Sequence, residues 1–207
     1  MPIINHFEDV LTHFRQNAFS ERDKGHRFER LIQAYLQTDP NYAHLFKQVW
    51  LWNEFPEREQ FGNQDTGIDL VALTHTGNYW AVQCKCFDEN SYIDKAALDT
   101  FLSTSSRTFL EEQQQTIAFA HRLWVSTSNK WSSNAEQAIH NQNPPVSRVN
   151  LSDLENSPIN WQALFDGLSG NQARVKQKSL YPHQTEAVQK TNAHFKTNDR
   201  GKLIMAC

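Results

Sequence analysis

Residues 68 to 73 and 79 to 87 form two short runs rich in β-forming apolar residues, in which a period of two, typical of β-strands, is expected. The first strand is expected over Ile68 to Leu73 and the second over Tyr79 to Phe87. Between them, residues 75 to 78 read HTGN and supply the Gly and Asn that a tight turn needs. The pattern therefore predicts a β-hairpin at the centre of the chain.

Three polar side chains are expected to meet on this hairpin. In a strand of period two, Gln83 and Lys85 point to the same face. If the turn centres on Thr76 or Gly77, Asp69 lies opposite Gln83 or Lys85, with Cβ atoms about 5 Å apart. Carboxylate and amide oxygens suit Mg²⁺, and an adjacent ammonium can orient a water and offset charge on a phosphorus. The plainer alternative is an ordinary hairpin with a surface salt bridge between Asp69 and Lys85, worth about 0 to 1 kcal/mol.

Hydrophobic spacing elsewhere predicts alternating helices and strands, and hence an α/β fold. The order around the hairpin is helix, three strands, helix, strand. The expected helices cover Ile4 to Gln16, Glu21 to Leu36 with Ser20 as its cap, Ile93 to Ser106 and Asn134 to Asn141; the other expected strands cover Gln48 to Phe55, Arg122 to Ser126 and Val146 to Leu151.

An Asp, thirteen residues and then Gln-x-Lys resembles the PD-(D/E)XK nuclease superfamily in its Mrr-like variant, and the strings DTGIDLVAL and VQCK carry the resemblance. The resemblance implies a restriction-endonuclease-like αβββαβ core, with a mixed central sheet flanked by helices, over about residues 20 to 130. It further implies a DNA endonuclease that uses Mg²⁺, or Mn²⁺. Asp69, Gln83 and Glu29 would hold the metal, and Lys85 would position or activate the water.

Glu29 enters this set because related nucleases place a Glu from the N-terminal helix at the metal. There is also a physical reason, since Gln83 is neutral and Asp69 alone would face a divalent cation. The alternative is an exposed helix Glu beside Arg27 and Arg30.

Composition indicates a globular protein of 207 residues, with 39% hydrophobic residues and six Trp. The start, MPIINHFEDV, lacks a signal-peptide pattern, and no run approaches 18 apolar residues, so a soluble cytoplasmic protein without a membrane partner is expected. The three cysteines, Cys84, Cys86 and Cys207, favour small core side chains over a disulfide framework or a zinc site. Asp65, next to the hairpin, is expected to cap a turn.

Charge is unevenly distributed along the chain. Residues 1 to 170 hold 13 Lys and Arg against 21 Asp and Glu, a balance of −8, whereas residues 171 to 207 hold 7 against 2, a balance of +5. An acidic main domain does not attract DNA through a general field. Either other modules deliver DNA to this domain, or a local cleft carries a more positive charge than the domain average.

The composition changes near residue 166, which predicts a nuclease domain over 1–165, a linker over 166–180 and the incomplete start of a helicase-like ATPase domain over 181–207. A helix beginning at Pro182 would bury Ala187, Val188 and Phe195. The string YPHQTEAV resembles the segment before the first ATPase motif of superfamily 2 helicases, in which Gln184 would bind adenine. No GxxxxGK[ST] is present. The plainer alternative is a closing helix of the same domain.

A Mrr-like nuclease domain before a helicase-like segment resembles the layout of type ISP restriction–modification enzymes, and the chain is expected to be the amino-terminal piece of one. The resemblance implies double-stranded DNA as substrate, and helicase, methyltransferase and target-recognition domains downstream. ATP and S-adenosylmethionine would serve only the full-length enzyme, in which two nuclease domains pair transiently after translocation. Two alternatives are a non-catalytic DNA-binding or docking module with a nuclease fold, and an interaction domain that regulates an adjoining ATPase.

Overall fold

A mixed β-sheet runs through the first of the two units into which the chain divides, Met1–Val175 and Lys176–Cys207. The computed structural model describes residues 6–62, 66–88, 90–111, 115–175 and 181–202. Asp65, Cys207 and residues 176 to 180 of the expected linker lie outside the described residues.

The sheet has six strands in the order β1-β2-β3-β6-β5, with β8 also paired to β6. β1 to β3 are antiparallel neighbours, β3 and β8 run parallel to β6, and β5 is antiparallel to it. A mixed sheet is therefore confirmed. The strands are β1 (Phe46–Leu51), β2 (Leu70–Thr74), β3 (Tyr79–Lys85), β5 (Thr108–Leu110), β6 (Thr116–Ser126) and β8 (Val146–Val149), and a separate pair is formed by β4 (Tyr92–Ile93) and β7 (Lys130–Trp131).

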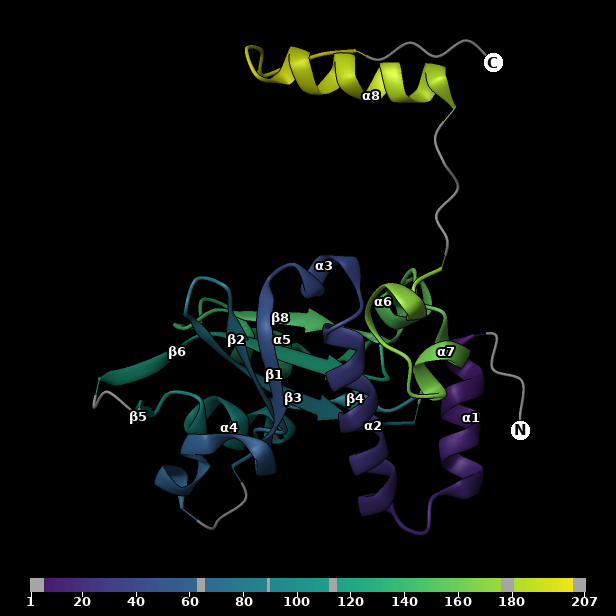
Figure 1. Ribbon diagram of the computed structural model, residues 1–207. Helices are drawn as coiled ribbons and strands as arrows, with labels where there is room; N and C mark the ends of the chain where they lie inside the picture. The colour runs from purple at the N-terminus through teal and green to yellow at the C-terminus, as the bar shows by residue number, and fades with distance from the viewer. Residues whose placement is uncertain (1–5, 63–65, 89, 112–114, 176–180, 203–207) are drawn as a thin grey trace. The chain divides into compact units, whose positions relative to one another are not determined.

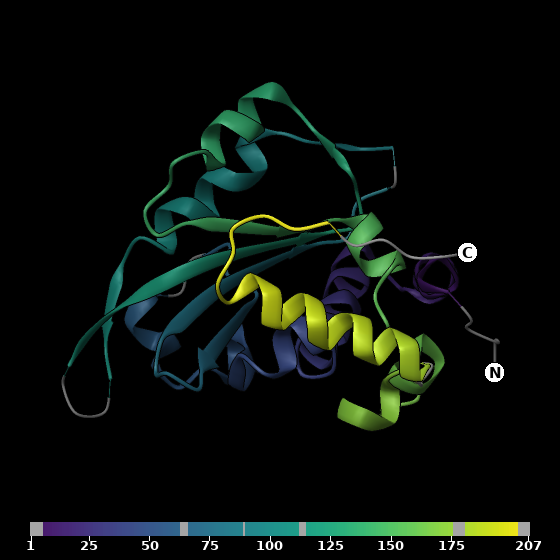
Figure 2. The same cartoon turned by 90° about the horizontal axis from the view of Figure 1, so that it is seen from above.

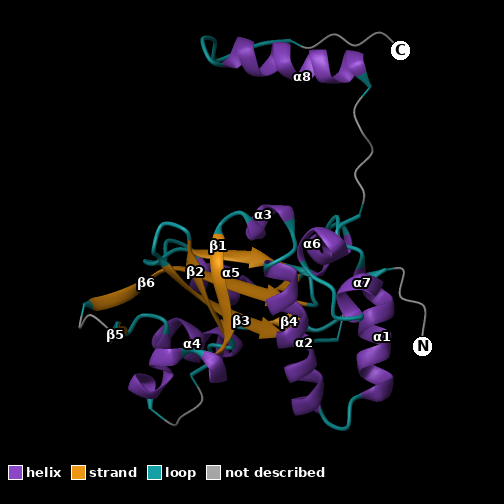
Figure 3. Ribbon diagram, viewed as in Figure 1, coloured by secondary structure: helices purple, strands orange, loops and turns teal. Residues whose placement is uncertain are grey.

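Helices cover both faces of this sheet (Figures 1, 2 and 3). One face packs against α1, α2, α6 and α7, and the other against α4, α5 and two short 3-10 helices. The αβββαβ core corresponds to α2, β1, β2, β3, α4 and β6. The helices of the first unit are α1 (Phe7–Asn17), α2 (Glu21–Leu36), α3 (Pro40–Ala43), α4 (Lys95–Thr104), α5 (Ser133–Ile139), α6 (Leu151–Glu155) and α7 (Trp161–Phe165); the 3-10 helices named here are Trp52–Glu54 and Pro56–Phe61.

The predicted hairpin is present as β2 and β3. Leu70 pairs with Val82 and Leu73 with Tyr79, which centres the turn on Thr76. Gly77 in this turn has φ of 85°, a conformation that glycine adopts without strain. The register places Asp69, the residue before β2, opposite Gln83.

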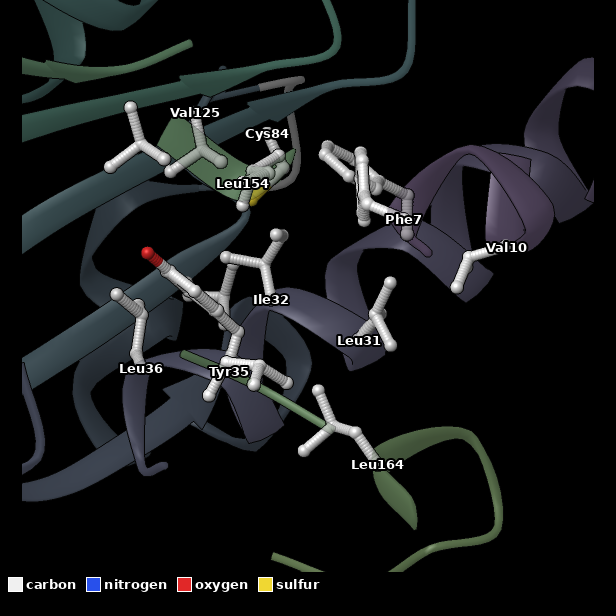
Figure 4. Packing of buried hydrophobic residues seen from close by; sticks show 14 of the residues in the cluster. Phe7, Val10, Leu31, Ile32, Tyr35, Leu36, Cys84, Val125, Leu154 and Leu164 are labelled. Atoms are coloured by element: carbon white, nitrogen blue, oxygen red, sulfur yellow. The ribbon is translucent and has the colours of Figure 1, made fainter. Parts of the chain in front are cut away.

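Alternate residues of β3 enter two different hydrophobic cores. Val82 and Cys84 belong to the core under α1 and α2, whereas Tyr79 and Ala81 belong to the core under α4. Figure 4 shows Cys84 in the first core, close to side chains of α1 and α2. The alternation predicted for this strand is therefore confirmed, and Cys84 acts as a small buried side chain.

α2 begins and ends where the sequence predicts. Ser20 caps it by accepting a hydrogen bond from the Asp23 backbone N–H at 3.1 Å. Phe28, Ile32 and Leu36 are among its buried residues. Because this stripe packs on β1 and β3, the opposite edge of α2 remains available to line a cleft.

Several boundaries differ from those expected. The first strand ends at Leu51 and not at Phe55, because the Glu54 carboxylate accepts the Leu51 N–H at 3.2 Å and closes a 3-10 turn. β6 begins at Thr116, six residues before the expected Arg122, and its first part pairs with β5 in a ribbon that extends beyond the sheet (Figure 1). The last strand stops at Val149, and α6 begins two residues later.

Residues 166 to 175, expected as the start of a linker, are packed in the first unit. The Arg174 side chain donates to the Thr38 carbonyl at 2.6 Å, and Ala173 is fully buried. The segment also pairs with nearby residues, since the Asn160 N–H donates to the Ala173 carbonyl at 2.8 Å. Composition did not reveal this packing because it depends on tertiary contacts, including those to Thr38, 136 positions before Arg174.

The second unit contains α8 (Pro182–Phe195), whose start at Pro182 agrees with the sequence. The expectation that this helix buries its apolar side chains is wrong for the described residues, because Val188 is 48% and Phe195 52% exposed. The described part of this unit holds no other helix or strand to cover them.

None of the described helices is both long enough and apolar enough to cross a lipid bilayer.

Arg122 of β6 is fully buried and bonded only to neutral acceptors in the described structure. These bonds join β6 to the C-terminal end of α4 and to the loop before β8. The acceptors are Ser105 Oγ and Ser106 Oγ at 2.6 Å, the carbonyls of Pro144 at 2.8 Å and Leu102 at 3.2 Å, and Gln142 Oε1 at 3.4 Å. The guanidinium thus fixes α4 against the sheet.

We expect Arg122→Met to lower the free energy of unfolding by about 3 kcal/mol, because it leaves several buried acceptors without a donor. Urea unfolding followed by far-UV circular dichroism measures this. The matched variant Arg58→Met, at an exposed position, should change stability by less than about 0.5 kcal/mol. Equal effects of the two substitutions would contradict this role for Arg122.

Candidate active site

An open cleft of 810 Å³ lies where α2 faces the ends of β1 and β2. Glu29 projects from α2 on one side, and Asp69 lies on the other, just before β2 begins. The structure therefore brings these two predicted residues together. The cleft is lined by Arg22, Gly25, His26, Glu29, Arg30, Leu51, Trp52, Asn53, Thr66, Ile68 and Asp69.

Asp69 is held against β3 by two hydrogen bonds to one carboxylate oxygen. Its Oδ2 accepts the Cys84 backbone N–H at 2.6 Å and the Gln83 side-chain amide at 3.0 Å. Its own backbone N–H donates to the Val82 carbonyl at 2.9 Å. These bonds fix the carboxylate through the strand register and leave Oδ1 without a hydrogen bond in the described structure.

Gln83 lies behind Asp69 and is only 2% exposed. Its Nε2 faces Asp69, and its Oε1 faces Gly67, at which an added Cβ would lie 3.0 Å from this oxygen and 2.9 Å from the Phe101 nitrogen. Gly67 also has φ of 62°. Only glycine fits between Gln83 and α4 here, so this contact helps to set the position of the amide.

Lys85 is two residues beyond Gln83 on β3 and does not line the cleft. Its ammonium lowers the pKa of Asp69 through its charge, although no salt bridge joins it to any described carboxylate. The expected alternative, a plain Asp69–Lys85 ion pair, is therefore absent from the described residues.

Burial is the main cause of the raised pKa of Asp69. Burial, together with the smaller effect of the negative charge of Glu29, raises the pKa of this carboxyl from 3.8 to about 6. The Cys84 hydrogen bond, the Lys85 charge and the Gln83 hydrogen bond oppose the rise. The net effect is a site that disfavours an isolated negative charge and gains from a cation.

The donor set fits a hard divalent cation in part. Glu29 Oε2 contacts His26 Nδ1 at 3.1 Å, so one oxygen of Glu29 and one of Asp69 are without hydrogen bonds in the described part of the chain. The Gln83 oxygen would face Asp69 after a half-turn of its amide, which exchanges O and N. The described residues contain no group of three His, Cys, Asp or Glu, so a third protein ligand would have to be an amide such as Gln83.

Sequence reasoning did not single out the residues that line the α2 side of this cleft with Glu29. Arg22, Gly25, His26 and Arg30 recur at intervals of three and four along α2. That spacing places them on one helix face with Glu29, so a helical projection around Glu29 would have found them.

Gln184 lies in the second unit, and its side chain forms a hydrogen bond at the start of α8. Its Oε1 accepts the Tyr181 backbone N–H at 3.0 Å. This is a helix-capping contact, and its expected adenine contact stays a prediction.

The raised pKa of Asp69 predicts a pH-dependent stability. Because the folded-state pKa of about 6 exceeds the unfolded value of 3.8, protonated Asp69 favours folding below about pH 4, and this contribution is lost as the pH rises through 6. Above pH 7 the ionised group should oppose folding by about 3 kcal/mol. Asp69→Asn keeps an acceptor for Cys84 and should therefore raise the free energy of unfolding at pH 8 by roughly that amount.

Urea titrations between pH 8 and pH 4 test this expectation, and the gain of Asp69→Asn should shrink toward zero as the pH falls. Asp99→Asn, at an exposed position paired with Lys95, serves as the control and should change little at any pH. A gain for Asp69→Asn that is constant with pH would show that desolvation of the carboxylate is not its source.

Comparisons with known proteins agree with this architecture. A family model described as restriction endonuclease matches residues 37–171. Among solved structures, the chain resembles an ATP-dependent Type ISP restriction-modification enzyme, LlaBIII, bound to DNA, with 29% identity and a TM-score of 0.67. The match covers 98% of this chain and 12% of LlaBIII, so the chain spans a small part of that enzyme's length.

Two further structures are more distant. The MspJI restriction endonuclease in complex with a 27-mer oligonucleotide has 15% identity and a TM-score of 0.44, over 72% of this chain and 29% of that one. The DNA modification-dependent restriction endonuclease AspBHI has 14% identity and a TM-score of 0.40, over 91% of this chain and 38% of that one. No curated protein matched the chain. Since a model of this family matches more than half of its length, the chain belongs to the Mrr-like restriction endonuclease family.

Proposed function

We propose that this chain is the metal-dependent endonuclease domain of an ATP-dependent restriction–modification enzyme and hydrolyses phosphodiester bonds of DNA. The observation that carries the proposal is the convergence of Asp69 and Glu29 on one cleft, with Gln83 bonded to Asp69 and Lys85 following on β3. Membership of the restriction endonuclease family supports it.

Asp69, Glu29 and Gln83 would hold Mg²⁺ or Mn²⁺ through their oxygens. When bound, the metal supplies Lewis-acid stabilisation of the scissile phosphate and lowers the pKa of a bound water. Asp69 is suited to this role because it is fixed by the Cys84 N–H and because burial makes its ionised form costly without a cation.

Lys85 would orient the attacking water and offset the negative charge that develops on the phosphorus. Its ammonium has no salt-bridge partner among the described residues, so no described carboxylate neutralises it directly. Its positive charge nevertheless lowers the pKa of Asp69, so the Lys85 ammonium and this predicted metal ligand interact electrostatically.

The substrate in this proposal is double-stranded DNA, and the partners are domains that the likeness to LlaBIII suggests. A helicase, a methyltransferase and a target-recognition domain would follow in the same polypeptide and would use ATP and S-adenosylmethionine. Translocation would bring two nuclease domains together. In this arrangement α8 begins the helicase-like segment, and the exposed Val188 and Phe195 would pack against parts that follow it.

Replacing Lys85 by Ala should reduce DNA cleavage by at least about 100-fold, because the water loses its orienting cation. The assay is nicking of a supercoiled plasmid by this 207-residue chain with Mg²⁺ or Mn²⁺ and without ATP. Lys47→Ala removes an exposed Lys at the opposite end of β1 and should cleave like the unchanged chain.

Cleavage at the normal rate by Lys85→Ala would exclude the proposed mechanism. If neither chain nicks DNA, the same substitution is made in the longer ATP-dependent enzyme. Cleavage there that requires Lys85 supports a nuclease that depends on its motor. Cleavage that survives the substitution favours a docking module with a nuclease fold.

Metal binding should be visible without any DNA. We expect Mg²⁺ to raise the midpoint of thermal unfolding at pH 8, because a ligand that binds only the folded state stabilises it by about 2.7 kcal/mol at 100 times its Kd. Asp69→Asn and Glu29→Gln should each reduce this rise, and Asp99→Asn should preserve it. A rise of equal size in all four proteins would place the metal elsewhere.

A further inference from the structure

One face of α2 forms the wall of the cleft and carries two arginines, with a glycine, a histidine and a glutamate between them along the helix. Arg22, Gly25, His26, Glu29 and Arg30 all line the cleft, and their spacing of three or four residues places them on the same stripe. We call Arg22, Gly25 and Arg30 the α2 row.

The two arginines of the α2 row are exposed and have no salt bridge to a described carboxylate. The neighbouring cations are already engaged. His26 contacts Glu29 at 3.1 Å, Arg27 pairs with Asp23 at 3.0 Å, and Lys24 with Glu21 at 2.7 Å. Arg22 and Arg30 thus keep their positive charge for a ligand in the cleft.

Gly25 lies between them along the helix, next to the exposed His26, and glycine is unfavourable in a helix interior. An added Cβ would meet only Glu29 Oε1, at 3.9 Å, so packing within the protein does not require glycine at this position. The absence of a side chain lets another molecule approach the helix backbone closely between the two arginines.

We propose that the α2 row binds the sugar-phosphate backbone of duplex DNA beside the phosphate that enters the cleft, with Arg22 and Arg30 on flanking phosphates and Gly25 at the point of closest approach. This inference rests on the proposed function and names the surface that holds the substrate. Eight residues of helix span about 12 Å, and each strand of duplex DNA carries a phosphate about every 3.4 Å of the axis. Arg22 and Arg30 can therefore contact different phosphates of one strand.

The α2 row also explains how an acidic chain can hold a polyanion. Residues 1 to 170 carry a net charge of −8, which opposes DNA at long range. Two arginines beside the cleft, neither paired with a described carboxylate, provide a local attraction, and the planar guanidinium suits phosphate oxygens. Binding through this row does not need the metal, because neither arginine belongs to the predicted metal ligands.

The test is binding of a fluorescent DNA duplex to the 207-residue chain, by anisotropy, in EDTA and over a series of salt concentrations. Replacing both arginines, Arg22→Gln with Arg30→Gln, should weaken binding at least tenfold at low salt. It should also reduce the magnitude of the salt slope by about 2, since each lost phosphate contact removes about 0.9. Lys47→Gln removes one exposed charge outside the cleft and should leave both quantities nearly unchanged.

The Gly25→Gln variant separates an effect on protein stability from an effect on DNA binding. A side chain better suited to a helix should raise the thermal unfolding midpoint, whereas its bulk in the cleft should weaken DNA binding. A protein that is more stable and binds less DNA supports the role of Gly25, and one that binds DNA as before overturns it.

The outcomes for the inference and for the proposed function are distinct. Unchanged binding by the double arginine variant overturns the α2 row even if the chain cleaves plasmid. Undetectable binding by the unchanged chain at low salt overturns it as well. Loss of binding in the variant, together with no metal-dependent cleavage by any form of the enzyme, supports the α2 row and overturns the nuclease.

Discussion

The register of β2 on β3 is the constraint on which the site depends, because it decides which strand atoms meet the Asp69 carboxylate. Pairing of Leu70 with Val82 aligns Asp69 with Gln83 and lets its carboxylate accept the Cys84 N–H at 2.6 Å. A shift by one residue would turn the alternate side chains of β3 to the opposite faces. Val82 and Cys84 would then leave the core under α1 and α2, so burial of these side chains protects the geometry of the site.

Electrostatics in the cleft is a balance between desolvation and nearby charges. Burial and Glu29 raise the pKa of Asp69 to about 6, while Lys85 and two hydrogen bonds hold it from rising further. A protein gains nothing in stability from such a carboxylate at neutral pH. A buried carboxylate beside a second carboxylate in a cleft is typical of a functional site. There a bound cation would offset the cost of burying the ionised group.

The face of the hairpin that packs against α4 also fixes the position of the site. Gly67 fits between the Gln83 amide and the backbone of Phe101, and Arg122 fixes the C-terminal end of α4 through Ser105 and Ser106. Both contacts are buried and polar, so they specify one position of the helix as well as stabilising it. The position of Gln83 behind Asp69 is therefore supported from two elements distant in sequence.

The sequence by itself determined the hairpin, α2 and the αβββαβ order, because these follow from local periodicity, from the Ser20 cap and from the turn at Gly77. It also indicated that Asp69 lies opposite Gln83 or Lys85, since pairing across a short turn is a local property, and the observed register selects Gln83. Only the tertiary structure decided that Lys85 forms no ion pair with a described carboxylate and that residues 166 to 175 pack within the first unit. It alone also decided that α2 lines the cleft with two arginines that no described carboxylate pairs. These features depend on contacts between distant segments and on burial, which no local pattern of residues encodes.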